Sequence, residues 1–260
     1  MNSKVIKARI KKLSISISNA QEKDVQKLVN QEIDFLKKNY VITYARTALT
    51  LYRTAFPQLK KMFSITDDEQ NKIEKQYKSK IAKQANNQKQ INNYEALIST
   101  AESLLSSSKV VDVAAGLLLL TGRRMSEIFC TAKLSKAGKN SAFFVGQLKK
   151  RENAAVYEIL LLSSFEKIQA ALQWLRSEAG DLETAAANKR YEKTLSQSVY
   201  KHFNKYLGDC TAHDLRKAYA TIIIKLHRPK NRTEQAFISQ YLGHSEDDLS
   251  TATIYQKYYI

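Results

Sequence analysis

Apolar residues recur every three or four positions along the first part of the chain, which is the spacing of amphipathic helices. Residues 1–115 contain no glycine and a single proline, Pro57, so they offer few positions for tight turns. A capping-box pattern, Thr66-Asp-Asp-Glu69, precedes an apolar series with a period of four. The apolar positions of this region are Tyr44, Ala48, Leu51, Tyr52 and Phe56, followed by Ile73, Tyr77 and Ile81. We therefore predict that the N-terminal region is a helical bundle.

The pattern changes after the polar stretch NNQKQINN at residues 86–93. Helical spacing continues over 94–120, but 141–150 and 154–162 are rich in strand-forming residues and flank a polar turn, which predicts a hairpin. Helical spacing resumes at Ser164. We predict two domains, a helical domain at 1–93 and a mainly α domain with a small β-sheet at 94–260.

The charge of the chain narrows the choice of partner. Lys and Arg number 42 against 25 Asp and Glu, a net charge of +17 that is concentrated in residues 1–93 and favours a polyanion, with nucleic acid ahead of a membrane surface. The longest apolar run, 113–120, is far too short to span a bilayer, so we expect no membrane insertion. Cys130 and Cys210 are isolated thiols, which is typical of a reducing compartment and gives no zinc-binding pattern.

Three short sequences carry basic side chains suited to phosphate chemistry. In TGRRMSEI (121–128), Arg124 can present a planar fork to two phosphate oxygens, although a solvated arginine pair is an equal alternative. In GQLKKRENA, Lys149 and Lys150 fall at the tip of the predicted hairpin, where a lysine can protonate a leaving oxygen or simply aid solubility. In HDLRKAYAT, His213 and Arg216 lie three residues apart and would share one face of a helix, where both could meet one anion, although a lone His-x-x-Arg is common by chance.

A fourth sequence, YLGHSEDDLSTATIYQKYYI, adds a histidine and a possible nucleophile. Gly243 suits a helix C-cap, His244 follows it, and Tyr255 lies further on. A phenol needs a cationic site or a base before it can attack a phosphate. Tyr255, Tyr258 and Tyr259 have the i, i+3, i+4 spacing of an aromatic helical face, so packing is the competing interpretation.

Taken together, these sequences resemble the tyrosine recombinase and telomere resolvase (protelomerase) superfamily over residues 110–260. The first motif of that superfamily, TG-x-R-x-S-E, is matched by Thr121, Gly122, Arg124, Ser126 and Glu127. The second is matched by His213-Asp-Leu-Arg216, and the third by Leu242-Gly243-His244 followed by Tyr255.

The resemblance implies a two-domain, C-shaped DNA clamp, made of a helical core-binding domain and a catalytic domain, that needs neither a cofactor nor a metal. Arg124 and Arg216 would clamp the scissile phosphate while Tyr255 attacks it, leaving a 3′-phosphotyrosyl link. Tyr258 and Tyr259 remain alternatives for the nucleophile. The proton donors and acceptors would be Lys149, with Lys150 as its alternative, together with His213 and His244.

Details of the motifs favour the telomere resolvase branch. The features that resemble that branch are the doubled arginine of TGRR, the GQLKKR and IYQKYYI sequences, and the long interval between His213 and His244 with its basic HRPKNR stretch.

Only five residues follow Tyr255, too few for a segment exchanged around a tetramer, so we expect a homodimer on a palindromic duplex. We also expect a cytoplasmic protein of a bacterial nucleoid or a phage-infected cell. The alternatives are a recombinase or integrase that exchanges strands between two duplexes and, ranked lower, a non-catalytic DNA-binding module.

Overall fold

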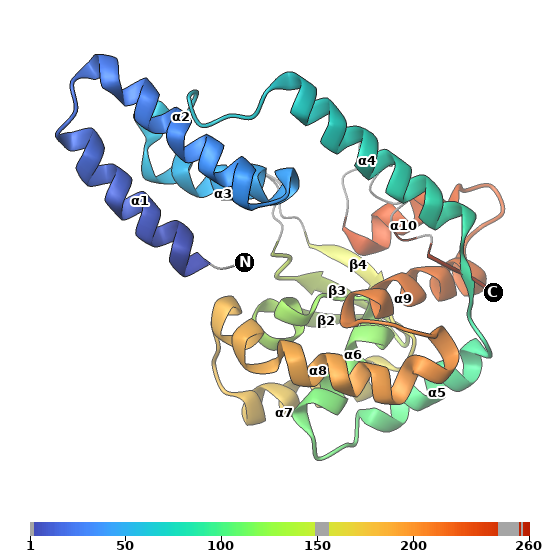
Figure 1. Cartoon of the computed structure of the whole chain (residues 1–260). Coiled ribbons are helices and arrows are strands. Elements are labelled where there is room, and N and C mark those ends of the chain that lie inside the picture. Colours follow the sequence, from blue (N-terminus) through green and yellow to red (C-terminus); the bar gives the residue numbers. More distant parts are fainter. Residues whose placement is uncertain (1–2, 149–155, 244–254, 256) are drawn as a thin grey trace. The chain divides into compact units, whose positions relative to one another are not determined.

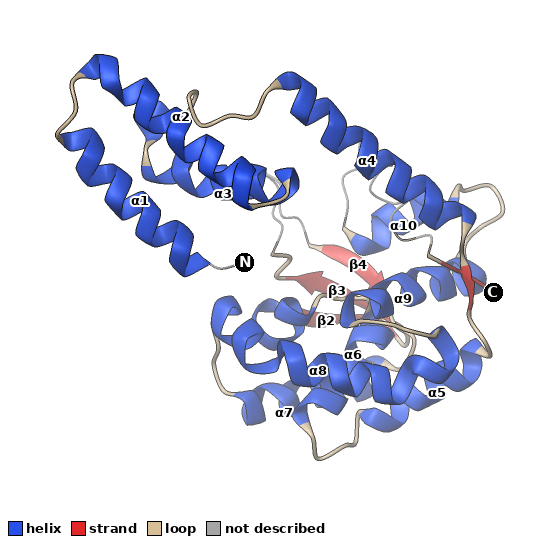
Figure 2. Ribbon diagram, viewed as in Figure 1, coloured by secondary structure: helices blue, strands red, loops and turns tan. Residues whose placement is uncertain are grey.

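The computed structural model describes residues 3–148, 156–243, 255 and 257–260, in which helices form most of the ribbon and strands a small part (Figures 1 and 2). The chain divides into two compact units, Met1–Lys80 and Ile81–Ile260, and the division falls within one helix, α4. The prediction of a mainly α fold with a small sheet is confirmed, whereas our functional boundary after residue 93 stays a prediction. Among the described residues, no helix combines the length and apolarity needed to cross a membrane.

The first unit is a helical bundle with aromatic side chains in its core. Its core contains Tyr52 and Phe63, whose ring centroids are 5.3 Å apart, and Phe56 stacks on the same phenylalanine. The glutamate Glu32 accepts two hydrogen bonds from Arg9, at 2.8 and 2.9 Å, and a third from the Tyr52 hydroxyl at 2.9 Å. The helices are α1 (Ser3–Ser18), α2 (Glu22–Asn39), α3 (Ile42–Ala55) and the 3₁₀ turn η1 (Pro57–Leu59).

Helix α4 (Asp67–Asn86) begins with the predicted capping box. The Thr66 backbone N–H donates to the Glu69 carboxylate at 2.9 Å, and the Glu69 N–H donates back to the Thr66 hydroxyl at 3.3 Å. The predicted apolar face is only partly correct, because Ile73 is buried while Tyr77 is 53% exposed. The capping residues therefore determine where this helix begins, and packing determines which of its apolar residues are covered.

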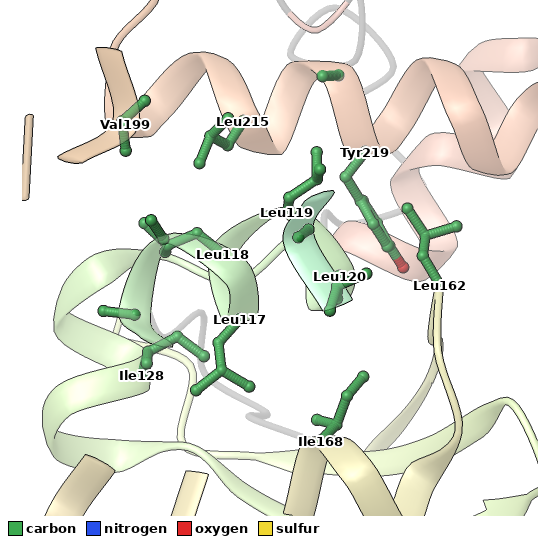
Figure 3. Packing of buried hydrophobic residues seen from close by; sticks show 14 of the residues in the cluster. Leu117, Leu118, Leu119, Leu120, Ile128, Leu162, Ile168, Val199, Leu215 and Tyr219 are labelled. Carbon is green, nitrogen blue, oxygen red and sulfur yellow. The ribbon is translucent and has the colours of Figure 1, made fainter. Parts of the chain in front are cut away.

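The second unit is built around α6 (Val110–Thr121), whose residues from Asp112 to Thr121 are all buried. The apolar run that was too short for a membrane is thus a core helix, and Figure 3 shows its four leucines, Leu117 to Leu120, surrounded by side chains from other elements. Four helices pack on α6, namely α5 (Tyr94–Leu104), α7 (Phe165–Ala179), α8 (Thr184–Leu207) and α9 (Ala212–His227). Helix α10 (Glu234–Leu242) packs on α9 and on strand β4 (Tyr157–Leu160).

The predicted hairpin is present as β3 (Ser141–Val145) paired antiparallel with β4, with Ala142 opposite Ile159. Its tip, at 149–155, lies outside the described residues. A third antiparallel strand, β2 (Lys133–Gly138), which we did not predict, pairs with β3. Its polar sequence explains the omission, because the strand is largely exposed and carries little alternation of apolar residues.

A second, two-stranded sheet joins β1 (Lys89–Gln90) in parallel to β5 (Tyr258–Tyr259). The prediction of a helical aromatic face for the two tyrosines of β5 is therefore wrong. The backbone N–H groups of Lys89 and Ile91 donate to the carbonyls of Lys257 and Tyr259 at 3.0 and 2.9 Å, which holds the segment extended. Tyr258 is 3% exposed and Tyr259 46%, as expected for alternating sides of a strand.

Candidate active site

Two arginines, Arg123 and Arg124, follow the C-terminal end of α6 in the second unit. Gly122 caps the helix in the left-handed conformation with φ of 65°, and a Cβ atom there would lie 2.2 Å from a ring carbon of Tyr219. A side chain at this position is excluded both by the backbone conformation and by the buried ring. The close packing of Gly122 against the Tyr219 ring determines where α6 ends, and therefore where the side chains of Arg123 and Arg124 leave the backbone.

Arg124 is held by the carboxylate of Glu127. Its Nη1 lies 2.6 Å from Oε1 of Glu127, and its backbone N–H donates to Oε2 at 2.9 Å. Glu127 is fully buried, and burial alone would raise its pKa, but the charges of Arg123, Arg216 and Arg124 outweigh burial and lower it. The glutamate is therefore ionised at neutral pH and compensates part of a dense positive cluster.

Arg216 lies in the first half of α9 and is 1% exposed. Its guanidinium donates to the carbonyl oxygen of Gly122, to that of Leu242 at 3.0 Å, and through Nε to the hydroxyl of Tyr255 at 3.3 Å. These bonds connect the C-terminal ends of α6 and α10 to the segment that carries the tyrosine. A charge buried in this way is fixed in direction before any anion arrives, which is the preorganisation that phosphate chemistry exploits.

Tyr255 is 4% exposed, with its ring beside the Arg216 guanidinium. Burial would raise the pKa of its phenol, but the hydrogen bond and charge of Arg216, with the charges of Arg124 and Arg123, reverse the effect and lower the pKa below its ordinary value. A lowered pKa makes the phenolate easier to form, so the environment suits a tyrosine that acts as a nucleophile.

His213 lies at the edge of this cluster, with its ring centroid 6.3 Å from that of Tyr255. Although part of the residue is exposed, desolvation of the rest and the charges of Lys217 and Arg216 lower its pKa. The imidazole is therefore neutral at pH 7 and able to accept a proton. A hollow of about 450 Å³ is lined by His213, Arg124 and Arg216 together with residues of α8, among them Asn188 and Ser196.

The structure thus brings together four of the residues singled out in the sequence, Arg124, His213, Arg216 and Tyr255. Lys149, Lys150 and His244 lie outside the described residues.

Tyr258 and Tyr259, the two alternatives for the nucleophile, lie in surroundings that differ from those of Tyr255. Burial and the nearby carboxylate of Asp214 raise the pKa of Tyr258, and Tyr259 is largely exposed, so the geometry favours Tyr255.

Sequence reasoning assigned no role to Arg123, which is also 1% exposed. Its guanidinium donates to the Tyr157 hydroxyl, to the Tyr241 carbonyl at 2.7 Å and to the Thr121 carbonyl at 3.2 Å, and it lies 4.9 Å from the Phe144 ring centroid. It therefore ties α6 to β3, β4 and α10. The sequence did contain one indication that Arg123 is buried. It directly follows the C-cap glycine of an apolar helix, where a side chain has little access to water.

Glu127 and Arg176 are the other supporting residues. Glu127 was part of the first motif but received no role, although a carboxylate three residues after an arginine can pair with it. Arg176 donates to the carbonyls of Glu127 and Ile128 at 3.2 and 3.1 Å and so fixes the π-helical turn η2 (Glu127–Thr131). Within the described part of the chain, no group of three or more His, Cys, Asp or Glu side chains is arranged to hold a metal ion.

The mainly α arrangement with its small antiparallel sheet is a tyrosine recombinase-like fold, and within it an arginine cluster surrounds the buried Tyr255. The family model of the telomere resolvase ResT/TelK catalytic domain matches residues 87–258 of this chain. The chain therefore belongs to this family.

The relatives agree with this assignment. The protelomerase of Klebsiella oxytoca phage phiKO2 is 29% identical over 167 residues, 56% of this chain but 26% of that protein. The telomere resolvase ResT of Borreliella burgdorferi is 26% identical over 177 residues, 64% of this chain and 38% of the relative. The chain therefore matches about a quarter to two fifths of the length of these relatives.

Among solved structures, protelomerase TelA covalently complexed with substrate DNA has a TM-score of 0.90 at 23% identity. The match covers 98% of this chain and 88% of TelA. At this level of identity the comparison supports the fold.

Proposed function

We propose that this protein cleaves and rejoins DNA through a covalent 3′-phosphotyrosyl link to Tyr255. The observation that carries the proposal is the contact between the Tyr255 hydroxyl and the buried guanidinium of Arg216, at 3.3 Å, with Arg124 part of the same cluster. Two cations of fixed direction beside a phenol of lowered pKa supply the charge stabilisation that attack on a phosphodiester requires.

In the proposed reaction, the scissile phosphate is held between Arg124 and Arg216. The Nε contact of Arg216 with Tyr255 is long for a hydrogen bond, so a phosphate oxygen can take over this donor while the phenol turns toward phosphorus. The Tyr255 oxygen bonds to phosphorus, the bond from phosphorus to the 5′ oxygen breaks, and the phenol proton passes to neutral His213. Lys149, with Lys150 as the alternative, supplies the proton to the leaving 5′ oxygen, and His244 hydrogen-bonds the phosphate or the phenol.

The phosphotyrosyl link conserves the energy of the phosphoester, so a 5′-hydroxyl can reseal the strand without ATP. We further propose that the substrate is a replicated telomere junction and that each end is resealed as a hairpin, because the relatives in this family are named protelomerases and telomere resolvases. The protein would act in the bacterial cytoplasm as a homodimer on a palindromic duplex. Residues 1–93 would bind DNA, and residues 94–260 would perform the chemistry.

The test is to incubate the whole chain with a palindromic duplex, without metal or ATP, and to analyse the products under denaturing conditions. Tyr255→Phe removes the nucleophile, while Tyr259→Phe is the matched control on an exposed neighbour. Hairpin ends and a covalent adduct that maps to Tyr255 are the expected result. Strand exchange between two duplexes would favour a recombinase instead, and DNA binding without any adduct from the unmodified chain would leave only a DNA-binding module.

A further inference from the structure

The carboxylate of Asp214 receives donors from two distant parts of the sequence. Oδ2 accepts from both the backbone N–H and the hydroxyl of Thr211 at 3.0 Å, which caps α9. The same oxygen lies 2.9 Å from Nζ of Lys257, and the two side chains of this ion pair are 9% and 19% exposed. Because both partners are largely withdrawn from water, salt screens the pair only weakly. Asp214 therefore connects the start of α9 to the segment that follows Tyr255.

The contact between Arg216 and Tyr255 joins the same two parts of the chain as this ion pair. Arg216 follows Asp214 by two residues on α9, and Lys257 follows Tyr255 by two residues. The Lys257 N–H donates to the Tyr255 carbonyl at 2.9 Å, which links these two residues directly. Two side-chain contacts thus join α9 to Tyr255 and Lys257.

The far side of Lys257 is also fixed. Its carbonyl accepts from the Lys89 N–H at 3.0 Å, and the next carbonyl, that of Tyr258, accepts from the Thr221 hydroxyl at 3.3 Å. The segment around Tyr255 is therefore attached to strand β1 and to α9, and the Lys257 side chain provides an attachment to α9 that does not involve the reacting groups themselves.

We propose that Lys257 is a positioning residue that acts through Asp214 to hold the Tyr255 hydroxyl in register with Arg216. The role of Tyr255 itself rests on the proposed function. Burial would raise the pKa of Asp214, but the hydrogen bonds from Lys257 and Thr211 lower it, so the carboxylate is ionised at neutral pH. Neither Lys257 nor Asp214 needs to touch DNA in this role.

The first experiment compares single-turnover adduct formation at saturating DNA. Lys257→Met is expected to form adduct about tenfold to a hundredfold more slowly with unchanged DNA affinity, because small misplacements of a reacting group have effects of this order. Lys257→Arg, which can still pair with Asp214, should recover most of the rate. Lys136→Met is the control, because Lys136 pairs with Glu166 on the surface and is well exposed. An unchanged rate for Lys257→Met would overturn the inference.

The second experiment needs no DNA and uses Asp214→Asn, whose amide oxygen can still cap α9. The titration of the Tyr255 phenol is followed by NMR of ¹³Cζ-labelled tyrosine and assigned by its loss in Tyr255→Phe. Removing a nearby anion would by itself lower the pKa of Tyr255, so an upward shift of the midpoint reports displacement from Arg216. A downward shift or no shift would contradict positioning. If the midpoint rises but the unmodified chain forms no adduct, the proposed function fails while the positioning role stands.

Discussion

Each unit of this protein contains a cluster of arginine and glutamate around a buried tyrosine, and the two clusters have opposite effects on the pKa of the phenol. In the first unit, the Tyr52 hydroxyl donates to the carboxylate of Glu32, which also binds Arg9, and burial together with that carboxylate raises the pKa of Tyr52. In the second unit, the glutamate pairs with Arg124, and the Tyr255 hydroxyl instead meets the guanidinium of Arg216.

The difference shows that the contact partner of the phenol matters more than the composition of its surroundings. A hydrogen bond to a carboxylate stabilises the neutral phenol, whereas contact with a guanidinium stabilises the phenolate. The first cluster is therefore suited to structure and the second to chemistry, although both contain the same types of residue.

The largest expected effect comes from removing the guanidinium that distinguishes the second cluster. Arg216→Lys keeps a positive charge but loses the planar fork, and we expect adduct formation to fall by about a thousandfold, the effect of losing a preorganised donor. Arg9→Met, which breaks the cluster of the first unit, should lower the melting temperature but leave the rate within a few-fold. Rates and thermal unfolding measured on both variants decide this, and equal rates would refute the distinction between the clusters.

A smaller effect is expected from neutralising each glutamate. Glu127→Gln leaves three arginines with less compensation in a fully buried site, and we expect a loss of about 3 kcal/mol in the free energy of unfolding. Glu32→Gln should cost less, because its side chain is 13% exposed and has one cationic partner. Urea denaturation measures both values, and a larger loss in Glu32→Gln would reverse the comparison.

The pH dependence of Glu127 has a definite sign. Its folded pKa is lowered, so its contribution to stability is present above the ordinary carboxyl pKa and is lost as the pH falls through the folded value. Glu127→Gln should therefore remove part of the acid sensitivity of the second unit, which urea denaturation at a series of acidic pH values would detect.

The smallest effect is a difference in slope at alkaline pH. Tyr52 has a raised pKa, so its contribution to stability is present below about pH 10 and is lost as the pH rises, by up to about 1.4 kcal/mol per pH unit. Tyr255 has a lowered pKa and contributes in the opposite direction. Tyr52→Phe should flatten the alkaline loss of stability and Tyr255→Phe should steepen it, as measured by denaturation between about pH 9 and 11. If both substitutions changed the pH dependence of the free energy of unfolding in the same direction, the two phenols would not differ in the way that their contacts imply.

The sequence predicted the elements with strong local signals and missed the ones that depend on distant partners. The capping box of α4 and the Gly243 cap of α10 are encoded within a few residues, and both are present. Strand β5 was missed because Tyr258 and Tyr259 follow Tyr255 at the i+3 and i+4 spacing of a helix, and this pattern gives no sign of pairing with Lys89 and Gln90.

The candidate site shows the same limit. The residue types that suit phosphate chemistry, such as Arg124 and Arg216, can be recognised from motifs, but the motifs do not say which arginine meets a carboxylate and which meets a phenol. Arg123 was overlooked because adjacent arginines usually face water, and only the packing of Phe144 and Tyr157 shows that this one is buried. Compensation of buried charge is a property of the assembled core and cannot be predicted from spacing.

The parallel pairing of β1 with β5 has a consequence for synthesis. Contacts between residues far apart in sequence form late in folding, because closing a long loop is entropically costly. During translation, the arginines of α6 and α9 can be in place before the strand that anchors Tyr255 has emerged from the ribosome and docked on β1. The contact between the Tyr255 hydroxyl and Arg216 would then be one of the last to form, because the segment after Tyr255 is held in place only once β5 has paired with β1.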